Sequence, residues 1–311
     1  MVRRHGCALP YTQMIIANQF ISDAEYRAKT FATSRGDGIN TDDRPLVVQI
    51  AGSDPDTLLE CARMLQNHCD AIDLNLGCPQ HRAITDGYGA SLLHKEKWPT
   101  VSQIVRLLSA TLSVPIWCKI RLIPNNQTPA FAEMLQASGC KLITVHGRYA
   151  SATRRRNGAA DLDAIRAVKD AVSIPVVANG NVRGVEDLQR NMRLTGADGI
   201  MVGEAILVNP YIFEGSQTPE NPSDIIREYL EICAQVPPAA FSIISARQHI
   251  RNFLRPNVRS NSPQFKEALQ RAVTIPEILT VAMIPKKQFC RTWNIWIFSV
   301  ELAKPENLFI P

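Results

Sequence analysis

A cysteine in a short turn is the first residue of this sequence that could carry out chemistry. The segment 71–80 reads AIDLNLGCPQ, so Cys78 follows an apolar run and stands between Gly77 and Pro79. Proline restricts the backbone of the residue before it, and Gly77 would allow an unusual backbone angle. Because a thiol is mostly protonated at neutral pH, this residue could donate a proton to a substrate. The alternative is a small apolar residue that fills the end of a strand.

Three further polar side chains stand near the ends of apolar runs. Gln49 lies in LVVQIA, Lys119 in VPIWCKIR and His146 in LITVHGR. An ammonium group at the end of a buried strand is costly unless it faces a partner such as an anion or an electron-rich ring. The alternatives are a lysine whose charge reaches the rim of the protein and a histidine with a structural role. With Cys78, these side chains indicate a ligand site.

Two glycine-containing segments later in the chain could bind phosphate. They read IPVVANGN over 174–181 and GIMVGE over 199–204, and include Asn179, Gly180, Asn181 and Gly203. We expect them to be the last two strands of a barrel, where the following loops commonly hold phosphate. Ordinary Asn-Gly turns are equally compatible with the dipeptide alone.

Together these residues suit a phosphorylated flavin whose ring lies beside a proton donor, although other ligands remain open from the residues alone. We find no cluster of acidic residues typical of a metal site, and no pair of carboxylates placed for glycoside hydrolysis. The predicted site therefore has no metal.

The elements that must position these residues alternate along the chain. The candidate strands are 8–14, 46–50, 71–76, 114–120, 142–146, 174–178 and 199–203. The candidate helices between them are 56–67, 100–109, 129–137, 161–171 and 185–194. Strand, helix, strand at this pitch predicts parallel pairing, either in an open doubly wound sheet or in a (β/α)8 barrel.

Two features favour the barrel. An open nucleotide-binding sheet usually carries a glycine-rich turn after its first strand, but Gly36-Asp37-Gly38 precedes a strand. Polar residues follow several different strands instead, as in barrel enzymes. We therefore predict a TIM (β/α)8-type barrel. The seven strands are one fewer than a barrel needs, so we expect that the first strand is absent from this chain or that one strand has been overlooked.

The pattern changes to helices after residue 215. We predict helices over 224–234, 241–254 and 263–273, while the tail 286–311 has no clear period. The expected domains are a catalytic barrel over 1–215 and a helical domain over 216–311. Arg247, Arg251 and Arg255 could give the second helix a basic face, and Arg154-Arg155-Arg156 forms a basic run. Such charges are usually only a solvated surface.

Composition narrows the class of protein. The chain of 311 residues carries 34 Lys and Arg against 29 Asp and Glu, and this mild excess permits an RNA partner without demanding one. None of the eight cysteines forms a CxxC pair, which makes a structural zinc site improbable. No apolar run is long enough to cross a bilayer, and no signal peptide is evident. We expect an intracellular protein, cytoplasmic or nuclear.

Several motifs, in this order and spacing, resemble tRNA-dihydrouridine synthases. They are DLNLGCPQ, CKIR, TVHGR, PVVANGN and GIMVGE. The eukaryotic branch that modifies the tRNA D-loop is most similar, on DDRPLVVQIAGSDPDTLLE and CDAIDLNLGCPQ. The resemblance is strong over about residues 3–215 and weak in the helical tail. In this family a first strand reading approximately APMV precedes the part that this sequence resembles.

The resemblance implies a barrel that binds flavin mononucleotide (FMN), followed by a helical domain that binds tRNA. NADPH or NADH would reduce the flavin, hydride would pass to carbon 6 of a uridine, and Cys78 would protonate carbon 5. Gln49, Lys119 and His146 would contact the flavin, and Asn75 would help to seat the flipped base. The residues implied to hold the flavin phosphate are Asn179, Gly180, Asn181, Gly203 and Glu204.

Two other functions are compatible with the sequence. The segments HRAITDGYGAS and YASATRRR differ from the family pattern, which usually has basic residues before Tyr-Gly-Ala and a threonine with charged residues after HGR. The chain could therefore be a truncated or diverged homologue that binds RNA without catalysis. It could also be another flavin barrel oxidoreductase that acts on a free pyrimidine.

Overall fold

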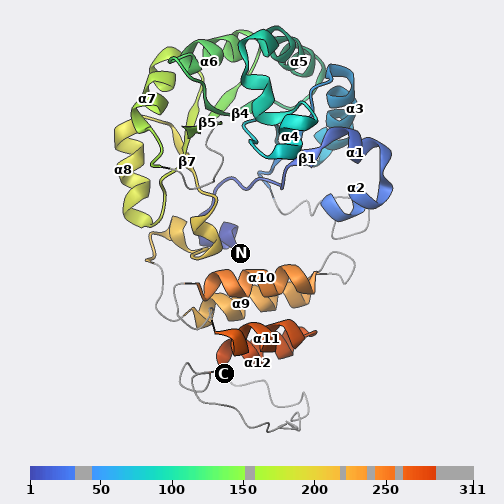
Figure 1. Ribbon diagram of the computed structural model, residues 1–311, viewed down its shortest axis with the longest axis vertical. Helices are drawn as coiled ribbons and strands as arrows, with labels where there is room; N and C mark the ends of the chain where they lie inside the picture. Colours follow the sequence, from blue (N-terminus) through green and yellow to red (C-terminus); the bar gives the residue numbers. More distant parts are fainter. Residues whose placement is uncertain (32–43, 151–157, 218–221, 237–241, 256–261, 285–311) are drawn as a thin grey trace.

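A parallel sheet surrounded by helices forms the larger part of the protein. The computed structural model describes residues 1–31, 44–150, 158–217, 222–236, 242–255 and 262–284. The arginine run at 154–156 and the tail at 286–311 lie outside these ranges. The sheet of the described residues has seven parallel strands in sequence order, β1 to β7. Helices lie along its outer side, so the fold is α/β and of the barrel type (Figure 1).

Six of the seven predicted strands occur where the apolar runs placed them. The strands are β1 Ile15–Ile16, β2 Val47–Ala51, β3 Ala71–Leu76, β4 Ile116–Leu122, β5 Leu142–Tyr149, β6 Val176–Asn179 and β7 Gly199–Met201. Every residue of β2 and β3 is buried, because side chains of the sheet pack on both sides.

The first predicted strand was wrong in its position. The structure has only a two-residue strand at Ile15–Ile16, after the predicted range 8–14. Pro10 has no N–H to donate, and only its carbonyl accepts a bond from Val47. The segment does run beside β2, since the amide of Thr12 donates to the carbonyl of Val47 at 2.9 Å. This segment therefore pairs with β2 locally and does not form a continuous strand there.

Most predicted helices match the observed ones to within a few residues. The helices are α1 Ala17–Ser22, α2 Ala24–Thr30, α3 Pro55–Leu65, α4 His81–Thr85, α5 Trp98–Thr111, α6 Thr128–Ala137, α7 Leu162–Ala171, α8 Val185–Thr195, α9 Ser223–Gln235, α10 Ile243–Phe253, α11 Pro263–Arg271 and α12 Ile275–Met283. Short 3-10 turns are η1 Val2–His5, η2 Gln66–His68, η3 Gly89–Leu93, η4 Lys95–Lys97, η5 Ala205–Leu207 and η6 Ile212–Glu214.

The sequence patterns did not predict α1, α2, α4 and α12. Three of these have seven residues or fewer, too short for a clear helical period. In contrast, α12 had a readable start signal, because Thr274 and Glu277 form a capping box. None of the described helices is long and apolar enough to cross a membrane.

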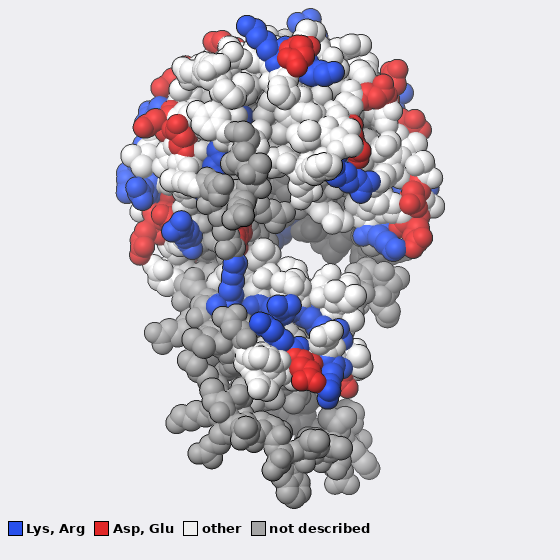
Figure 2. Space-filling model, in the orientation of Figure 1, with Lys and Arg blue, Asp and Glu red and all other residues white. Residues whose placement is uncertain are grey.

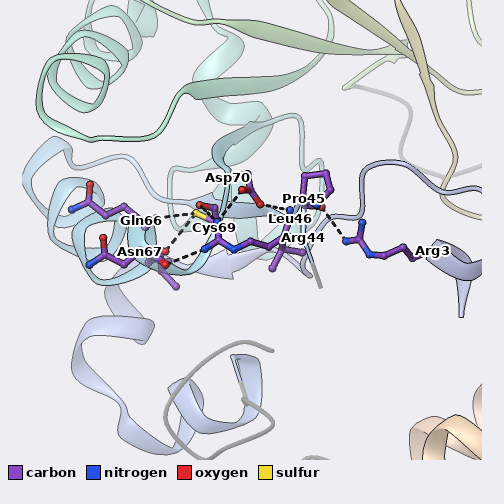
Figure 3. Close-up of polar contacts among 9 residues, drawn as sticks. Arg3, Arg44, Pro45, Leu46, Gln66, Asn67, Cys69 and Asp70 are labelled. Atoms are coloured by element: carbon purple, nitrogen blue, oxygen red, sulfur yellow. Dashed lines mark hydrogen bonds and ion pairs between the residues drawn. The ribbon is translucent and has the colours of Figure 1, made fainter. Parts of the chain in front are cut away.

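An arginine before β2 holds the amino-terminal side of the sheet (Figure 3). The guanidinium of Arg44 donates to Oδ1 of Asp70 at 2.9 Å and to the carbonyl of Asn67 at 3.1 Å. The other carboxylate oxygen of Asp70 accepts from the amide of Leu46 at 2.7 Å. These bonds join the start of β2 to the turn that leads into β3. They help to fix the register of β2, which carries Gln49, against β3, which leads into the Cys78 turn.

Two large apolar clusters stabilise the described residues, beside a small third one of Ala51, Ala83 and Tyr88. The larger one runs from Ile15 to Ala197 and lies between the sheet and its helices. The smaller one runs from Ile225 to Ala282 and joins α9, α10, α11 and α12. Met1 and Tyr211 pack against the smaller cluster, so the start of the chain contacts the helical part.

A histidine in η1 also links the start of the chain to the helical part. His5 Nδ1 lies 2.9 Å from Oε1 of Glu214, and its Nε2 lies 2.7 Å from Oε2 of Glu228 in α9. The hydroxyl of Tyr211 donates to the same oxygen of Glu228 at 2.9 Å. The rings of His5 and Tyr211 are 3.9 Å apart between centroids. This polar cluster is the contact between η1, η6 and α9.

Candidate active site

Polar side chains gather on the inner face of the sheet. In the strand register, Gln49 lies beside Asp73, and Asn75 lies beside Lys119. Side chains alternate between the two faces of a strand, and register partners point to the same face. Along β3, Asp73 and Asn75 are two residues apart and therefore share that face. The same rule places His146 there, two residues beyond Thr144, the register partner of Lys119.

Asn75 holds the turn that carries the cysteine. Its side-chain oxygen Oδ1 accepts hydrogen bonds from the amides of Gly77 at 3.0 Å and Cys78 at 2.9 Å. Asn75 itself is only 8% exposed, whereas Cys78 is partly exposed. The predicted cysteine turn at the carboxyl end of β3 is therefore present, and its cysteine is partly exposed.

The other side of this turn is also held. The carbonyl of Cys78 accepts from the amide of Ala90 at 3.0 Å, and the carbonyl of Gly77 accepts from Nε of Arg121 at 2.8 Å. Gly89 has a φ of +63°, and a Cβ added there would lie 2.9 Å from the Cβ of Cys78. Only glycine fits that position without strain. The predicted unusual angle at Gly77 was wrong: the described glycines with positive φ do not include it.

A buried carboxylate begins the chain of hydrogen bonds that reaches the turn. Gln49 Nε2 donates to Oδ2 of Asp73 at 2.7 Å, and Gln49 Oε1 accepts from Nδ2 of Asn75 at 2.8 Å. Asp73 is fully buried, and its Oδ1 has no hydrogen-bond partner among the described residues. Burial raises the pKa of Asp73 above its ordinary value, while the Gln49 bond and the charge of Lys119 lower it. Gln49 and Asn75 are predicted site residues, whereas Asp73 was not predicted.

Lys119 is influenced by one carboxylate and by a second cation. Burial lowers the pKa of its ammonium below the ordinary value, the charge of Asp73 raises it, and that of Arg121 lowers it. Arg121 follows two residues later on the same face and is 9% exposed. The inner face thus carries more positive than negative charge around Lys119, which suits an anionic ligand.

His146 is neutral in this surrounding. Burial, and then the charges of Lys119, Arg121 and Arg148, lower the pKa of its imidazole to about 3. Nη1 of Arg148 lies 3.3 Å from Nε2 of His146. A guanidinium can only donate, so Nε2 is the acceptor and the ring proton is on Nδ1. The ring therefore presents one N–H donor at the carboxyl end of β5.

The residues predicted to hold phosphate lie at the ends of β6 and β7, and several make bonds within the protein. Asn179 Nδ2 donates to the carbonyl of Met201 at 2.8 Å, which ties β6 to β7. Asn181 has a φ of +59°, accepts from the amide of Ala160 at 2.7 Å and donates to its carbonyl at 2.9 Å. The side chain of Asn181 thus holds a loop.

Gly203 and Glu204 follow β7. Space is open around Gly203, where an added Cβ would have no atom within 4 Å. Glu204 precedes η5 and pairs at 3.4 Å with Arg255, in the turn that follows α10. Gly180 has a φ of +115°, and its carbonyl accepts from Asn191 of α8 at 3.0 Å. Accessible backbone at Gly203 is the feature of this group that best suits a phosphate.

The missed residues had a readable signal. Asp73 stands two residues before Asn75, Arg121 two after Lys119 and Arg148 two after His146. Strand periodicity alone would have placed each of them on the same face as its predicted neighbour. The described residues hold no group of three His, Cys, Asp or Glu that could bind a metal.

The arrangement as a whole offers a proton donor, hydrogen-bond donors and excess positive charge at one end of the sheet. Cys78 can give a proton, and the side chains of Gln49, Lys119 and His146 can position a polar, anionic ligand beside it. Such a combination suits proton transfer to a substrate held against a bound cofactor.

Comparisons with known proteins agree in one family. A sequence model described as Dihydrouridine synthase (Dus) matches residues 1–274. A tRNA-dihydrouridine(16/17) synthase-like protein of Rattus norvegicus is 38% identical over 288 residues, 91% of this chain and 62% of the relative. A tRNA-dihydrouridine(16/17) synthase of Saccharomyces cerevisiae is 35% identical over 263 residues, 82% of this chain and 61% of the relative. The names of both relatives carry NAD(P)(+).

A third relative has a different position in its name. A tRNA-dihydrouridine(20a/20b) synthase-like protein of Homo sapiens is 34% identical over 240 residues, 76% of this chain and 72% of the relative. The chain spans about three fifths of the length of the rat and yeast relatives. Since the family match runs from residue 1 to residue 274 and includes every site residue described above, the chain belongs to the dihydrouridine synthase family.

Proposed function

We propose that this chain is a tRNA-dihydrouridine synthase, an FMN-dependent NAD(P)H oxidoreductase that reduces uridine to dihydrouridine in tRNA. The observation that carries the proposal is the held cysteine turn. Asn75 accepts from the amides of Gly77 and Cys78, and Gly89 and Ala90 bound the turn on its other side. A thiol fixed in this way at the end of a strand is suited to deliver a proton to one atom of a positioned ring.

The residues of the inner face fit the flavin. Burial is the largest cause of the lowered pKa of His146, and the charges of Lys119, Arg121 and Arg148 add to it. These three cations lie where the anionic cofactor would be held. When bound and reduced by NADPH or NADH, FMN would supply the hydride for carbon 6 of the uracil ring. Gln49, Lys119 and His146 would hold the ring system of the cofactor. The residues that would hold its phosphate are Asn179, Gly180, Asn181, Gly203 and Glu204.

The protein's own contribution to the reaction is proton delivery and orientation. Cys78 would give its Sγ proton to carbon 5 of the uracil, so that hydride and proton together saturate the C5–C6 bond and the thiolate takes up a proton from solvent. Asn75 would help to seat the base while its Oδ1 holds the cysteine turn. The neutral His146 would donate a hydrogen bond through Nδ1 without adding another charge.

The helical part would contact tRNA. Figure 2 shows Lys and Arg side chains gathered over α10, below the sheet part of the molecule. Arg251 is exposed, Arg255 is exposed and pairs with Glu204, and Arg247 donates to the carbonyl of Ala272 at 2.9 Å. Arg251 therefore has the greatest freedom to meet phosphate. A uridine must leave the tRNA stack to reach the thiol, and backbone contacts of this kind can offset that cost.

The two large apolar clusters support a division of the chain into two domains. We assign residues 1–215 to a catalytic domain and residues 216–311 to a tRNA-binding domain, because the larger cluster ends at Ala197 and the smaller one begins at Ile225. A tRNA substrate implies an intracellular location.

The proposed function is tested by two measurements on the purified chain. The first is the visible spectrum after reconstitution with FMN, with NADPH or NADH then added. The second is dihydrouridine formation in unmodified tRNA, with Cys78→Ala as the variant. We expect bound flavin that NADPH reduces in both proteins, and dihydrouridine only with the unmodified chain.

The matched control is Cys7→Ala, a second partly exposed cysteine, which should leave product formation unchanged. Flavin binding with full product formation by Cys78→Ala would remove Cys78 from its role. Binding of tRNA without flavin or product would favour the alternative of a homologue that binds RNA without catalysis. Reduction of free uridine but not of tRNA would favour an oxidoreductase acting on free pyrimidines.

A further inference from the structure

An unbroken chain of hydrogen bonds joins a buried carboxylate to the cysteine turn. From Oδ2 of Asp73 it runs to Gln49 at 2.7 Å, then to Asn75 at 2.8 Å, and then to the amide of Cys78 at 2.9 Å. Three side chains on two adjacent strands make these contacts, and none of the three is more than 8% exposed. Water therefore has little access to replace a lost bond.

The two ends of this hydrogen-bond chain determine the orientation of the side-chain amides of Gln49 and Asn75 between them. Oδ2 of Asp73 accepts from Gln49, so Gln49 turns its NH2 group to Asp73 and its oxygen to Asn75. The backbone amides of Gly77 and Cys78 only donate, so Asn75 must turn its oxygen to them and its NH2 group to Gln49. Both ends require the same orientation. If either side-chain amide were flipped, a donor would face a donor or an acceptor would face an acceptor, and a buried hydrogen bond would be lost at a cost in stability.

We propose that Asp73 is a positioning residue for Cys78: its carboxylate fixes the orientation of Gln49 and Asn75 and, through them, holds the turn that carries the thiol. The significance of this role for catalysis rests on the proposed function, whereas the hold on the turn does not. Asp73 acts as an acceptor and touches neither the thiol nor a substrate.

Attraction to the charge of Lys119 does not by itself explain why a carboxyl group is buried at position 73. In the register Lys119 lies beside Asn75, and Asp73 lies beside Trp117. The carboxylate oxygen that does not bind Gln49 has no hydrogen-bond partner among the described residues. The hydrogen bond that Asp73 does make leads toward the cysteine turn, by way of Gln49.

The test measures how fast iodoacetamide alkylates Cys78 in the full-length chain, by mass spectrometry of the peptide that contains it. Asp73→Leu removes the acceptor and keeps the branched shape of the side chain, and Gln49→Met breaks the hydrogen-bond chain at its middle. Both should loosen the turn and raise the alkylation rate at least about fivefold. Asp73→Asn keeps an oxygen that can accept from Gln49 and should stay within about twofold of the unmodified chain.

Two internal references separate this effect from a general loss of structure. Thr144→Val changes another fully buried polar residue of the inner face, whose Oγ1 has no hydrogen-bond partner among the described residues, and should leave the rate unchanged. Cys61 in α3 is fully buried and should stay unreactive in every variant that is folded. If Asp73→Leu also exposes Cys61, Gln49→Met alone decides.

Three results would overturn the proposal. They are an unchanged Cys78 rate in the decisive variants, an equal acceleration in Thr144→Val, and an Asp73→Asn rate as high as that of Asp73→Leu. The last would mean that an oxygen acceptor does not hold the turn. Lack of dihydrouridine formation by the unmodified chain would count against the proposed function and leave the alkylation result standing.

Discussion

The amide of Cys78 donates a hydrogen bond of 2.9 Å to Oδ1 of Asn75, three residues earlier in the chain. The same oxygen accepts from the amide of Gly77 at 3.0 Å. One side-chain atom therefore closes the turn, and the backbone donors that a strand end normally leaves without a partner are satisfied. The position of the thiol depends on this contact.

Asn75→Ala is expected to destabilise the protein by about 2–4 kcal/mol, because two amides in the turn lose their acceptor and Gln49 loses its donor. Urea unfolding at neutral pH measures the change. Asn67→Ala is the control, since Asn67 is exposed and meets Arg44 through its backbone carbonyl. That variant should stay within about 0.5 kcal/mol of the unmodified chain. Equal stability of the two variants would contradict the role of the Asn75 side chain.

Gly89→Ala is expected to displace the cysteine turn. The added methyl would lie 2.8 Å from the carbonyl oxygen of Cys78, and the φ of +63° is itself unfavourable for alanine. Gly215→Ala is the control for backbone strain alone, because Gly215 has a φ of +81° and an added Cβ there would have no atom within 4 Å. Thermal unfolding should show a loss of about 1 kcal/mol for the control and at least about 2 kcal/mol for Gly89→Ala.

His146 makes stability depend on pH. Its pKa of about 3 in the folded protein lies below the ordinary value of about 6.5 expected in the unfolded chain. As the pH falls below about 6.5, the imidazole of His146 takes up a proton in the unfolded chain but not in the folded protein. The free energy of unfolding therefore decreases toward pH 3. Above about 6.5 this contribution is complete.

His146→Gln should therefore lose less stability between pH 7 and pH 5 than the unmodified chain, by about 1–2 kcal/mol after allowance for partial exposure. Urea unfolding across that range measures the difference. His81→Gln changes an exposed histidine and should follow the unmodified chain. Parallel curves for His146→Gln and the unmodified chain would mean that the imidazole is not held neutral.

His5→Ala is expected to weaken the contact between η1 and the helical part. His5 bonds Glu214 and Glu228 and stacks on Tyr211, and its side chain is only 17% exposed. A loss of about 1–3 kcal/mol is expected, measured by thermal unfolding. The control Lys29→Ala breaks an ion pair with Glu25 in which both side chains are more than 70% exposed, and it should leave the unfolding temperature unchanged.

Arg251→Ala is expected to weaken tRNA binding severalfold and to reduce the slope of affinity against salt concentration by about one. Filter binding or anisotropy at several salt concentrations measures both quantities. Arg271→Ala is the control, because Arg271 is exposed on α11 and pairs with Glu267. If both variants bind as the unmodified chain does, the tRNA contacts lie elsewhere.

Much of the fold followed from local patterns. The apolar runs at 46–50, 71–76 and 142–146 became β2, β3 and β5, because a strand buried on both sides needs a continuous apolar run. The cysteine turn was also readable, since it depends on neighbours in the chain. In contrast, β1 was misplaced: which part of 8–16 pairs with β2 depends on hydrogen bonds across 30 residues or more.

The sequence by itself determined which residue types stand at the strand ends, and thus that a thiol, a lysine and a histidine share one end of a parallel sheet. Only the tertiary structure decided that Asp73 bonds Gln49, that Arg148 donates to His146 and that Arg247 binds the carbonyl of Ala272. The physical reason is that alternation along a strand sets the face on which a side chain lies, whereas its hydrogen-bond partner comes from another strand or helix. That partner is determined once register and packing have brought the two together.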